Sequence, residues 1–222
     1  MRDGCSMKVV VFLGPSLSHQ EARKILNEAE YRQPAGRGDV VRATNDGADA
    51  IGLIDGVFYQ QAAVSHREIL YAIKKGITVM GGSSMGALRA SELDGYGMVG
   101  VGKIYNWYKE GAINSDDEVA LVFNPETLAP ITEPLVNIRA TLEGLLKRRA
   151  VDEEECETIL KAARAVPFQL RNYQRIVQRA IIDGLDRGRG RIVLDSMMAE
   201  RVDQKRLDAI EVLKKLKELF ST

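Results

Sequence analysis

The segment ITVMGGSSMGALRASEL, residues 77–93, has the pattern of a short apolar strand, a turn of glycine and serine, and a helix. Its turn, GGSSMG at residues 81–86, contains a G-x-S-x-G pattern centred on Ser84. In that pattern the central serine sits on a tight corner between strand and helix, and the next amide points to where an oxyanion would form. We therefore expect Ser84 to be a nucleophile and the Met85 amide to be an oxyanion donor.

The same pattern has a second interpretation. Glycine-rich turns also occur without any chemistry, and the pattern alone leaves that alternative open. The two flanking glycines are needed on either interpretation, because a side chain there would crowd the corner. If the turn is functional, the helix that follows it favours a negatively charged ligand at its N-terminus.

Further apolar runs predict the rest of a sheet. Besides residues 77–80, strands are expected at residues 7–13, 39–43, 50–54 and 119–123. Helical patterns fall between several of them, at residues 19–30, 65–75, 87–93 and 103–110. Continuous apolar strands that alternate with helices are typical of a parallel sheet covered on both faces. The expected fold class is therefore α/β, with a Rossmann-like parallel β-sheet core flanked by helices and a C-terminal helical region.

The character of the chain changes after Pro125, Pro130 and Pro134. From there the apolar residues recur at helical spacing, which predicts helices at residues 134–149, 152–164, 169–185, 191–200 and 203–220. We accordingly expect an α/β core domain with the active site at residues 1–129. A helical domain that docks a partner is expected at residues 130–222.

Several polar residues follow the predicted strands. Parallel sheets place ligands outside the carboxyl ends of their strands, so these residues should gather at one edge. Asp55 follows one strand, Ser84 follows another, and His66 begins a helix on the same side. We expect Ser84 as nucleophile, His66 as base and Asp55 as the carboxylate that orients the imidazole. The residues expected to bind substrate or an oxyanion are Gly14, Ser16, Gly56, Met85 and Arg89.

Simpler interpretations compete at most of these positions. His66 could be only a cap or surface residue, and Asp55-Gly56 only a turn. Arg89 could bind an anionic group or simply pair with Glu92. Other carboxylates could orient the base, and they are Glu68, Asp117 and Glu118.

Composition narrows the class of protein. The formal net charge is zero, so nothing in it favours nucleic acid or an anionic membrane as a partner. No apolar run is long enough to span a bilayer. Cys5 and Cys156 lack the spacing of a zinc site or a disulfide framework. We expect a cytoplasmic protein that needs neither metal nor cofactor, although a divalent ion at Asp117 and Glu118 remains an alternative.

Several motifs resemble one family. The sequence reads FLGPSL at residues 12–17, IDGVF at 54–58, AVSHREIL at 63–70 and SMGALRA at 84–90. These segments resemble the TfuA-like proteins closely over residues 8–123, and VDQKR at 202–206 resembles them more loosely. Family members often carry tryptophan where this chain has Ser65.

The resemblance implies a function. TfuA-like proteins act with YcaO enzymes, which convert a peptide backbone amide to a thioamide. The TfuA-like partner is understood to hydrolyse the C-terminal thiocarboxylate of a ThiS-type sulfur carrier protein and so release sulfide. The thioamidated target can be a glycine of methyl-coenzyme M reductase or a ribosomally made peptide. This implies a serine-type hydrolase; the alternatives are a non-catalytic allosteric or docking subunit of the YcaO complex and a small-molecule esterase.

Overall fold

The computed structural model describes residues 7–57 and 62–219. Phe58, the last residue of the IDGVF segment, therefore lies outside the described residues. The chain divides into two compact units. The first comprises residues 1–116 and 205–222, and the second comprises residues 117–204. This division differs from the expected one at residues 129 and 130, because the last helix belongs to the first unit.

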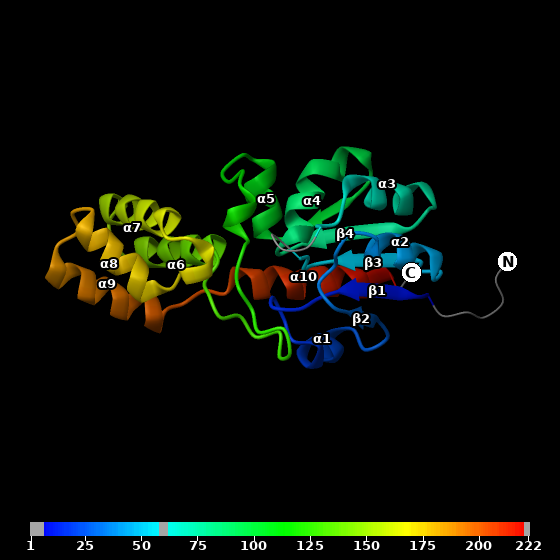
Figure 1. Ribbon diagram of the computed structural model, residues 1–222, viewed down its shortest axis with the longest axis horizontal. Helices are drawn as coiled ribbons and strands as arrows, with labels where there is room; N and C mark the ends of the chain where they lie inside the picture. Colours follow the sequence, from blue (N-terminus) through cyan, green and yellow to red (C-terminus); the bar gives the residue numbers. More distant parts are fainter. Residues whose placement is uncertain (1–6, 58–61, 220–222) are drawn as a thin grey trace. The chain divides into compact units, whose positions relative to one another are not determined.

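Five parallel strands form the centre of the first unit (Figure 1). They are β1 Val9–Phe12, β2 Glu30–Arg32, β3 Ala50–Leu53, β4 Thr78–Gly82 and β5 Val99–Val101. Their order across the sheet is β2-β1-β3-β4-β5. The sheet confirms the expected α/β fold class with a parallel Rossmann-like core. From β1 the chain first adds β2 on one side and then β3, β4 and β5 on the other, so the strand order switches between β1 and β3. Parallel sheets of this kind place ligands at such a switch point.

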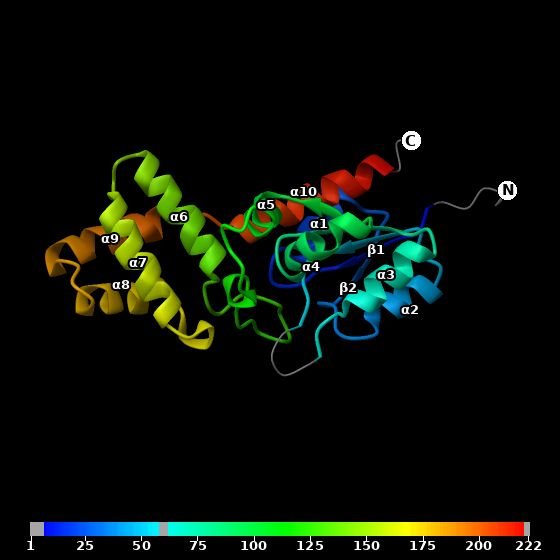
Figure 2. The same cartoon turned by 90° about the horizontal axis from the view of Figure 1, so that it is seen from above.

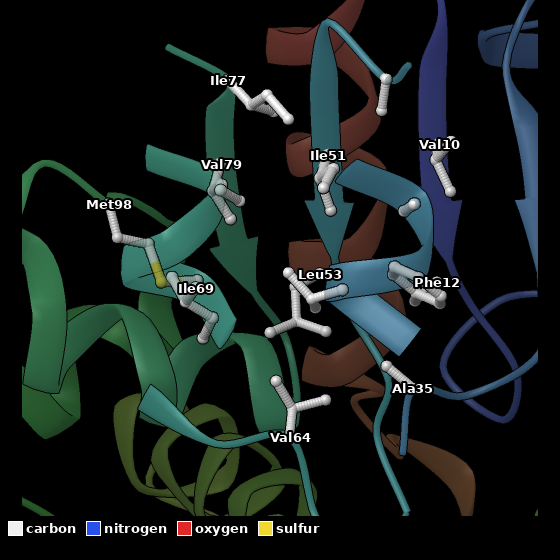
Figure 3. Packing of buried hydrophobic residues seen from close by; sticks show 14 of the residues in the cluster. Val10, Phe12, Ala35, Ile51, Leu53, Val64, Ile69, Ile77, Val79 and Met98 are labelled. Atoms are coloured by element: carbon white, nitrogen blue, oxygen red, sulfur yellow. The ribbon is translucent and has the colours of Figure 1, made fainter. Parts of the chain in front are cut away.

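Helices cover both faces of the sheet. Those of the first unit are α1 His19–Ile25, α2 Asp39–Asn45, α3 His66–Lys74, α4 Met85–Leu93, α5 Lys103–Lys109 and α10 Gln204–Glu218, with a 3-10 turn at Asp94–Tyr96. Side chains of α2, α3 and α4 pack on one face against Val10, Ile51 and Val79 (Figure 3). Helices α1 and α10 pack on the other face, where Val9 and Val11 meet buried residues of α10.

The structure corrects four segments of the predicted sheet. Residues 39–43 were expected as a strand, but they lie in α2, because Val40, Ala43 and Thr44 are buried at helical spacing. Residues 119–123 were also expected as a strand, but only Phe123 forms an isolated bridge, with Pro130. The edge strand is instead β5, at residues 99–101, where the glycines suggested a loop. The other edge, β2, likewise overlaps an expected loop.

The second unit is helical. It contains α6 Leu135–Lys147, α7 Glu153–Ala165, α8 Tyr173–Ile182 and α9 Arg187–Ala199, with a 3-10 turn at Phe168–Leu170. Another 3-10 turn, Asp116–Glu118, begins at the last residue of the first unit's N-terminal segment and continues into the second unit. The helices pack side by side around one apolar cluster that includes Leu142, Ile159, Ile176 and Val193 (Figures 1 and 2). These four helices overlap the ones predicted from residue 134 onward.

Helix α10 completes the first unit. Its residues Ala209, Val212, Leu213 and Leu216 are fully buried against the sheet. The approach is close: a Cβ added at Gly52 would lie 2.6 Å from the Leu216 side chain. Each fully buried aliphatic side chain contributes roughly 1.5–3 kcal/mol to stability. The last segment of the chain is thus part of the core that holds the strand ends in place.

Candidate active site

Asp55 lies at the carboxyl ends of β1 and β3 and is bound by the turn after β1. Its Oδ2 accepts hydrogen bonds from the Gly14 amide at 2.9 Å and the Ser16 amide at 3.0 Å. Its Oδ1 accepts from the Ser16 hydroxyl at 2.7 Å. Asp55 is 1% exposed, so these bonds replace water around the carboxyl group. Gly14, Ser16 and Asp55 were expected at the same edge of the sheet, and the structure brings them into contact there.

Ser83 is the strained residue of the turn after β4. Its φ is 67°, and the Ser84 amide donates across it to the Gly82 carbonyl at 2.8 Å. This is a γ-turn of the rare kind with positive φ at its centre, and such strain persists only where the surroundings enforce it. The Ser83 hydroxyl lies 2.8 Å from the Lys205 carbonyl and 2.9 Å from the Ser16 hydroxyl. The turn after β4 is therefore tied both to the turn after β1 and to α10.

Close backbone packing explains the glycines of the turn. A Cβ at Gly86 would lie 1.7 Å from the Leu53 carbonyl oxygen, and one at Gly82 would lie 2.5 Å from the Val101 carbonyl oxygen. Real Cβ atoms do not approach backbone this closely, so neither position accepts a side chain. The expectation that side chains would crowd this corner is confirmed. The glycines let α4 start directly against β3 and β5.

Ser84 stands just before the first residue of α4. It is 2% exposed, and among the described residues no hydrogen bond engages its hydroxyl. Every fully buried side-chain oxygen of the described residues has a partner, so the Ser84 oxygen keeps some solvent contact. The amides of Gly86 and Ala87, the second and third residues of α4, are used, because Gly86 donates to the Ile54 carbonyl and Ala87 to the Ser84 carbonyl. The site thus holds a hydroxyl at a helix N-terminus, where an anion is favoured.

Lys205 enters the same cluster from α10. Its side chain is 3% exposed, and its Nζ lies 4.0 Å from Asp55 Oδ1. The sequence interpretation missed this residue because α10 was assigned to a separate helical domain. A signal was present: Lys205 falls on the buried stripe that continues through Asp208, Ala209 and Val212. A lysine on the apolar face of a helix is rarely buried without a partner.

Two polar contacts fix the start of α10 around Lys205. The neighbouring Arg206 binds Glu21 of α1 at 2.8 Å, and this hydrogen bond lowers the pKa of the Glu21 carboxyl. Asp208 accepts from the Ile104 amide of α5 at 2.7 Å. Lys205 is therefore held between contacts to α1 and α5.

His66 and Arg89 form a separate group. His66 Nε2 lies 2.8 Å from Glu92, whereas Asp55 is bound by Gly14 and Ser16. Arg89 donates to the Val64 carbonyl at 2.9 Å and to the same Glu92 at 2.7 Å. The His66 side chain is 48% exposed, which is the setting of a surface pair between α3 and α4. The carboxylate that pairs with His66 is thus that of Glu92. Arg89 pairs with the same Glu92, which is the simpler of the two roles expected for it.

The remaining expected residues have structural contacts. Gly56 lies beneath the turn, since a Cβ there would be 2.7 Å from the Met85 side chain. Glu68 caps α3 and accepts from the Gly38 amide at 2.6 Å. Asp117 and Glu118 lie in the second unit, where they bind Arg171 at 2.6 Å and Arg139 at 2.7 Å. Over residues 7–57 and 62–219, no three His, Cys, Asp or Glu side chains are grouped to hold a metal ion.

The site combines the Ser84 hydroxyl with a buried amine, since the neighbouring Ser83 contacts the backbone of Lys205. Serine hydrolases activate their serine with histidine in some folds and with lysine in others. The second arrangement fits this site, which has a hydroxyl at Ser84, an adjoining helix N-terminus and a buried Lys205.

The helices of the described part of the chain include none that is both long and apolar enough to cross a membrane.

Comparison with known proteins identifies the family of the chain. No curated protein was found that matches the chain. The family model described as TfuA-like protein matches residues 55–172, more than half of the 222 residues. The matched region begins at Asp55, includes the turn after β4 and extends through Asn172 of the second unit. The chain belongs to the TfuA-like family.

Proposed function

We propose that this protein hydrolyses the C-terminal thiocarboxylate of a ThiS-type sulfur carrier protein. The sulfide released would serve a YcaO enzyme in the thioamidation of a peptide backbone, such as a glycine of methyl-coenzyme M reductase. Membership of the TfuA-like family supports a role beside a YcaO enzyme.

In the first step the Ser84 hydroxyl attacks the thiocarboxylate carbon, and its proton passes to Lys205. The Met85 amide and the N-terminus of α4 stabilise the negative charge on the tetrahedral intermediate. The carbon–sulfur bond then breaks, and sulfide leaves with a proton. This leaves an ester between Ser84 and the carrier.

In the second step water attacks that ester while Lys205 takes its proton. The ester bond breaks, Ser84 regains its proton, and the carrier leaves with a carboxylate. The sum is one thiocarboxylate and one water giving one carboxylate and one hydrogen sulfide. Lys205 replaces His66 as the proposed base because His66 is paired with Glu92 on the surface.

The observation that carries the proposal is the buried cluster at the carboxyl ends of β1, β3 and β4. Ser16, Asp55, Ser83 and Lys205 are each at most 3% exposed and come from four different segments. An apolar core needs no such group, because burying polar side chains costs free energy unless they are paired. Ser84 directly follows Ser83 in the chain, and a polar cluster next to the proposed nucleophile is what a hydrolase requires.

The test uses the purified full chain and a carrier whose C-terminus has been converted to a thiocarboxylate. Sulfide is measured over many turnovers without any YcaO enzyme, with the carboxylate form of the carrier as the blank. We expect sulfide to form in proportion to enzyme and time. If sulfide forms only at the uncatalysed rate and YcaO activity rises when the chain is added, the non-catalytic docking subunit is favoured instead. Turnover of simple esters but not of the carrier would favour an esterase.

A further inference from the structure

Gly56 is a buried residue just after β3, and among the described residues its backbone amide donates no hydrogen bond. The amides on either side of it are used. Asp55, just before it, donates to the Phe12 carbonyl at 3.1 Å. Val57, just after it, donates to the Ala35 carbonyl at 3.0 Å. Buried amides without a partner are rare, because each costs free energy comparable to a lost hydrogen bond. The Gly56 amide is therefore a donor whose acceptor the described chain does not supply.

The direction of this amide follows from the peptide unit to which it belongs. The carbonyl of that unit is that of Asp55, which accepts from the Ala35 amide at 2.9 Å. The peptide bond is trans, so its N–H points opposite to its C=O. The Gly56 N–H therefore points away from Ala35.

The side that the Gly56 N–H faces is where α4 begins. The Ile54 carbonyl accepts from the Gly86 amide of α4 at 3.2 Å. In an extended segment, this carbonyl and the N–H two residues later face the same side. The approach is close, since a Cβ added at Gly56 would lie 2.7 Å from Cγ of Met85 and 2.8 Å from its Cβ. The Gly56 amide thus opens toward the first turn of α4.

Two further donors at this place have no partner among the described residues. They are the Met85 amide and the Ser84 hydroxyl, on residues that are 1% and 2% exposed. The first amide of a helix has no acceptor within the helix, so the Met85 amide is left for a ligand. Three unused donors thus lie at the end of β3 and the start of α4, where an anionic oxygen is favoured.

We propose that the Gly56 amide is the second donor of an oxyanion hole, beside the Met85 amide. The inference rests on the proposed function and extends it. When the Ser84 oxygen bonds to the thiocarboxylate carbon, its proton passes to Lys205 as in the proposed first step. The carbon–oxygen double bond becomes single, and its electron pair moves onto the oxygen. That oxygen then accepts hydrogen bonds from both amides. Because Gly56 has no side chain, the substrate can approach its backbone closely.

The Gly56 amide is oriented before any substrate binds. The side chain of Asp55 is held by the amides of Gly14 and Ser16 at 2.9 and 3.0 Å. Its carbonyl is held by the amide of Ala35. The peptide unit between Asp55 and Gly56 is therefore fixed on one side. Donors that are already aimed at the developing charge need no reorganisation during the reaction.

The direct test follows the amide resonances of the full chain, labelled with ¹⁵N-glycine, as Ser84 reacts with diisopropyl fluorophosphate. The Ser84 oxygen bonds to phosphorus, and fluoride leaves with the serine proton. The phosphoryl oxygen then takes the place of the oxyanion. We expect the Gly56 amide proton to move downfield, because it gains a hydrogen bond. Gly14 and Gly86 are internal controls, since their amides are already bonded to Asp55 and Ile54.

The Ser84→Ala variant cannot form this adduct, so the reagent should leave its Gly56 resonance in place. An adduct on Ser84 of the wild type that leaves Gly56 unmoved would overturn the proposal. If Ser84 does not react, the same spectra are recorded with acetate as the source of an anionic oxygen. A Gly56 amide that does not respond to acetate then overturns the proposal as well.

A backbone substitution tests the contribution to the rate. Glycolic acid at position 56 replaces the N–H by an ester oxygen and keeps the shape of the chain. We expect kcat for sulfide release to fall roughly 10²–10³-fold, with a much smaller change in KM. The matched control is α-hydroxyisovaleric acid at Val57, which removes the next amide and its bond to Ala35. This control should lower the unfolding temperature and keep kcat near that of the wild type.

Wild-type kcat from the folded ester at position 56 would contradict the second donor. The resonance test does not use sulfide release, so the two proposals can fail separately. A chain in which Gly56 responds to the adduct but which releases no sulfide would contradict the proposed function and leave this inference standing. Sulfide release without any response of Gly56 would contradict this inference alone.

Discussion

Ser83 and Lys205 are 122 residues apart in the chain, yet the Ser83 hydroxyl lies 2.8 Å from the Lys205 carbonyl. This contact joins the turn that follows β4 to the first turn of α10. It places a buried lysine beside the serine turn of a TfuA-like protein. The candidate site is thus completed by the last helix of the chain.

Replacement of Lys205 by methionine should stop catalysis while the fold is kept. Methionine fills the buried stem but has no amine, so Ser84 loses its proposed base. We expect sulfide release to fall by roughly 10²–10⁴-fold. Sulfide release should also fall in Lys205→Arg, because a guanidinium does not give up its proton. The matched control is Lys214→Met on the exposed face of α10, and wild-type rates from Lys205→Met would exclude the amine as base.

His66 should be dispensable for the chemistry. Its imidazole is half exposed and bound to Glu92, so His66→Ala removes only a surface pair. We expect sulfide release to change by less than about tenfold, compared with the roughly 10²–10⁴-fold loss typical of a general base. The measurement is kcat/KM across pH, with Glu92→Gln alongside. A loss of two orders of magnitude together with a changed pH profile would restore His66 as the base.

Gly86 should tolerate no side chain. A Cβ there would overlap the Leu53 carbonyl oxygen at 1.7 Å, so β3 and α4 would have to separate. We expect Gly86→Ala to lose at least about 3 kcal/mol of unfolding free energy or to fail to fold. Gly95→Ala is the control, since a Cβ at Gly95 meets nothing within 4 Å and should change stability by less than about 1 kcal/mol. Equal urea unfolding midpoints for Gly86→Ala and the wild type would contradict the close approach of Gly86 to the Leu53 carbonyl.

Cys156 should be unreactive in the folded protein. Burial raises the pKa of its thiol to about 11, so the thiolate forms only as the pH rises toward that value. Thiolate is the form that alkylates. In a Cys5→Ser background, we expect iodoacetamide to label Cys156 much more slowly at pH 8 in the folded chain than in urea. Equal rates in the two states would mean that this face of α7 opens readily.

The parallel sheet and its serine turn could be predicted from local sequence. The apolar runs of β1, β3 and β4 are typical of strands buried on both faces, and the glycines mark the close packing of α4. The segment DVVRA at residues 39–43 misled the interpretation, because two adjacent valines suggest a strand. The structure has a helix there instead, because Val40, Ala43 and Thr44 recur at helical spacing and are buried.

The site was less predictable because half of it depends on long-range packing. Asp55 and Ser16 could be placed together by the strand-end rule. Lys205 could not, because the apolar stripe of α10 suits a helical bundle as well as a sheet. The change in character after Pro125 suggested that the rest of the chain was one helical domain. In the structure, the packing of Val212 and Leu216 against the sheet places α10 in the first unit.

The role of Ser84 as nucleophile is tested by sulfide release from a thiocarboxylated carrier by Ser84→Ala. Ser83→Ala is the matched variant, since it removes the neighbouring hydroxyl and its contacts with Ser16 and Lys205. We expect Ser84→Ala to release sulfide no faster than the uncatalysed reaction, whereas Ser83→Ala should keep measurable turnover at a lower rate. Wild-type sulfide release from a folded Ser84→Ala variant would contradict that role.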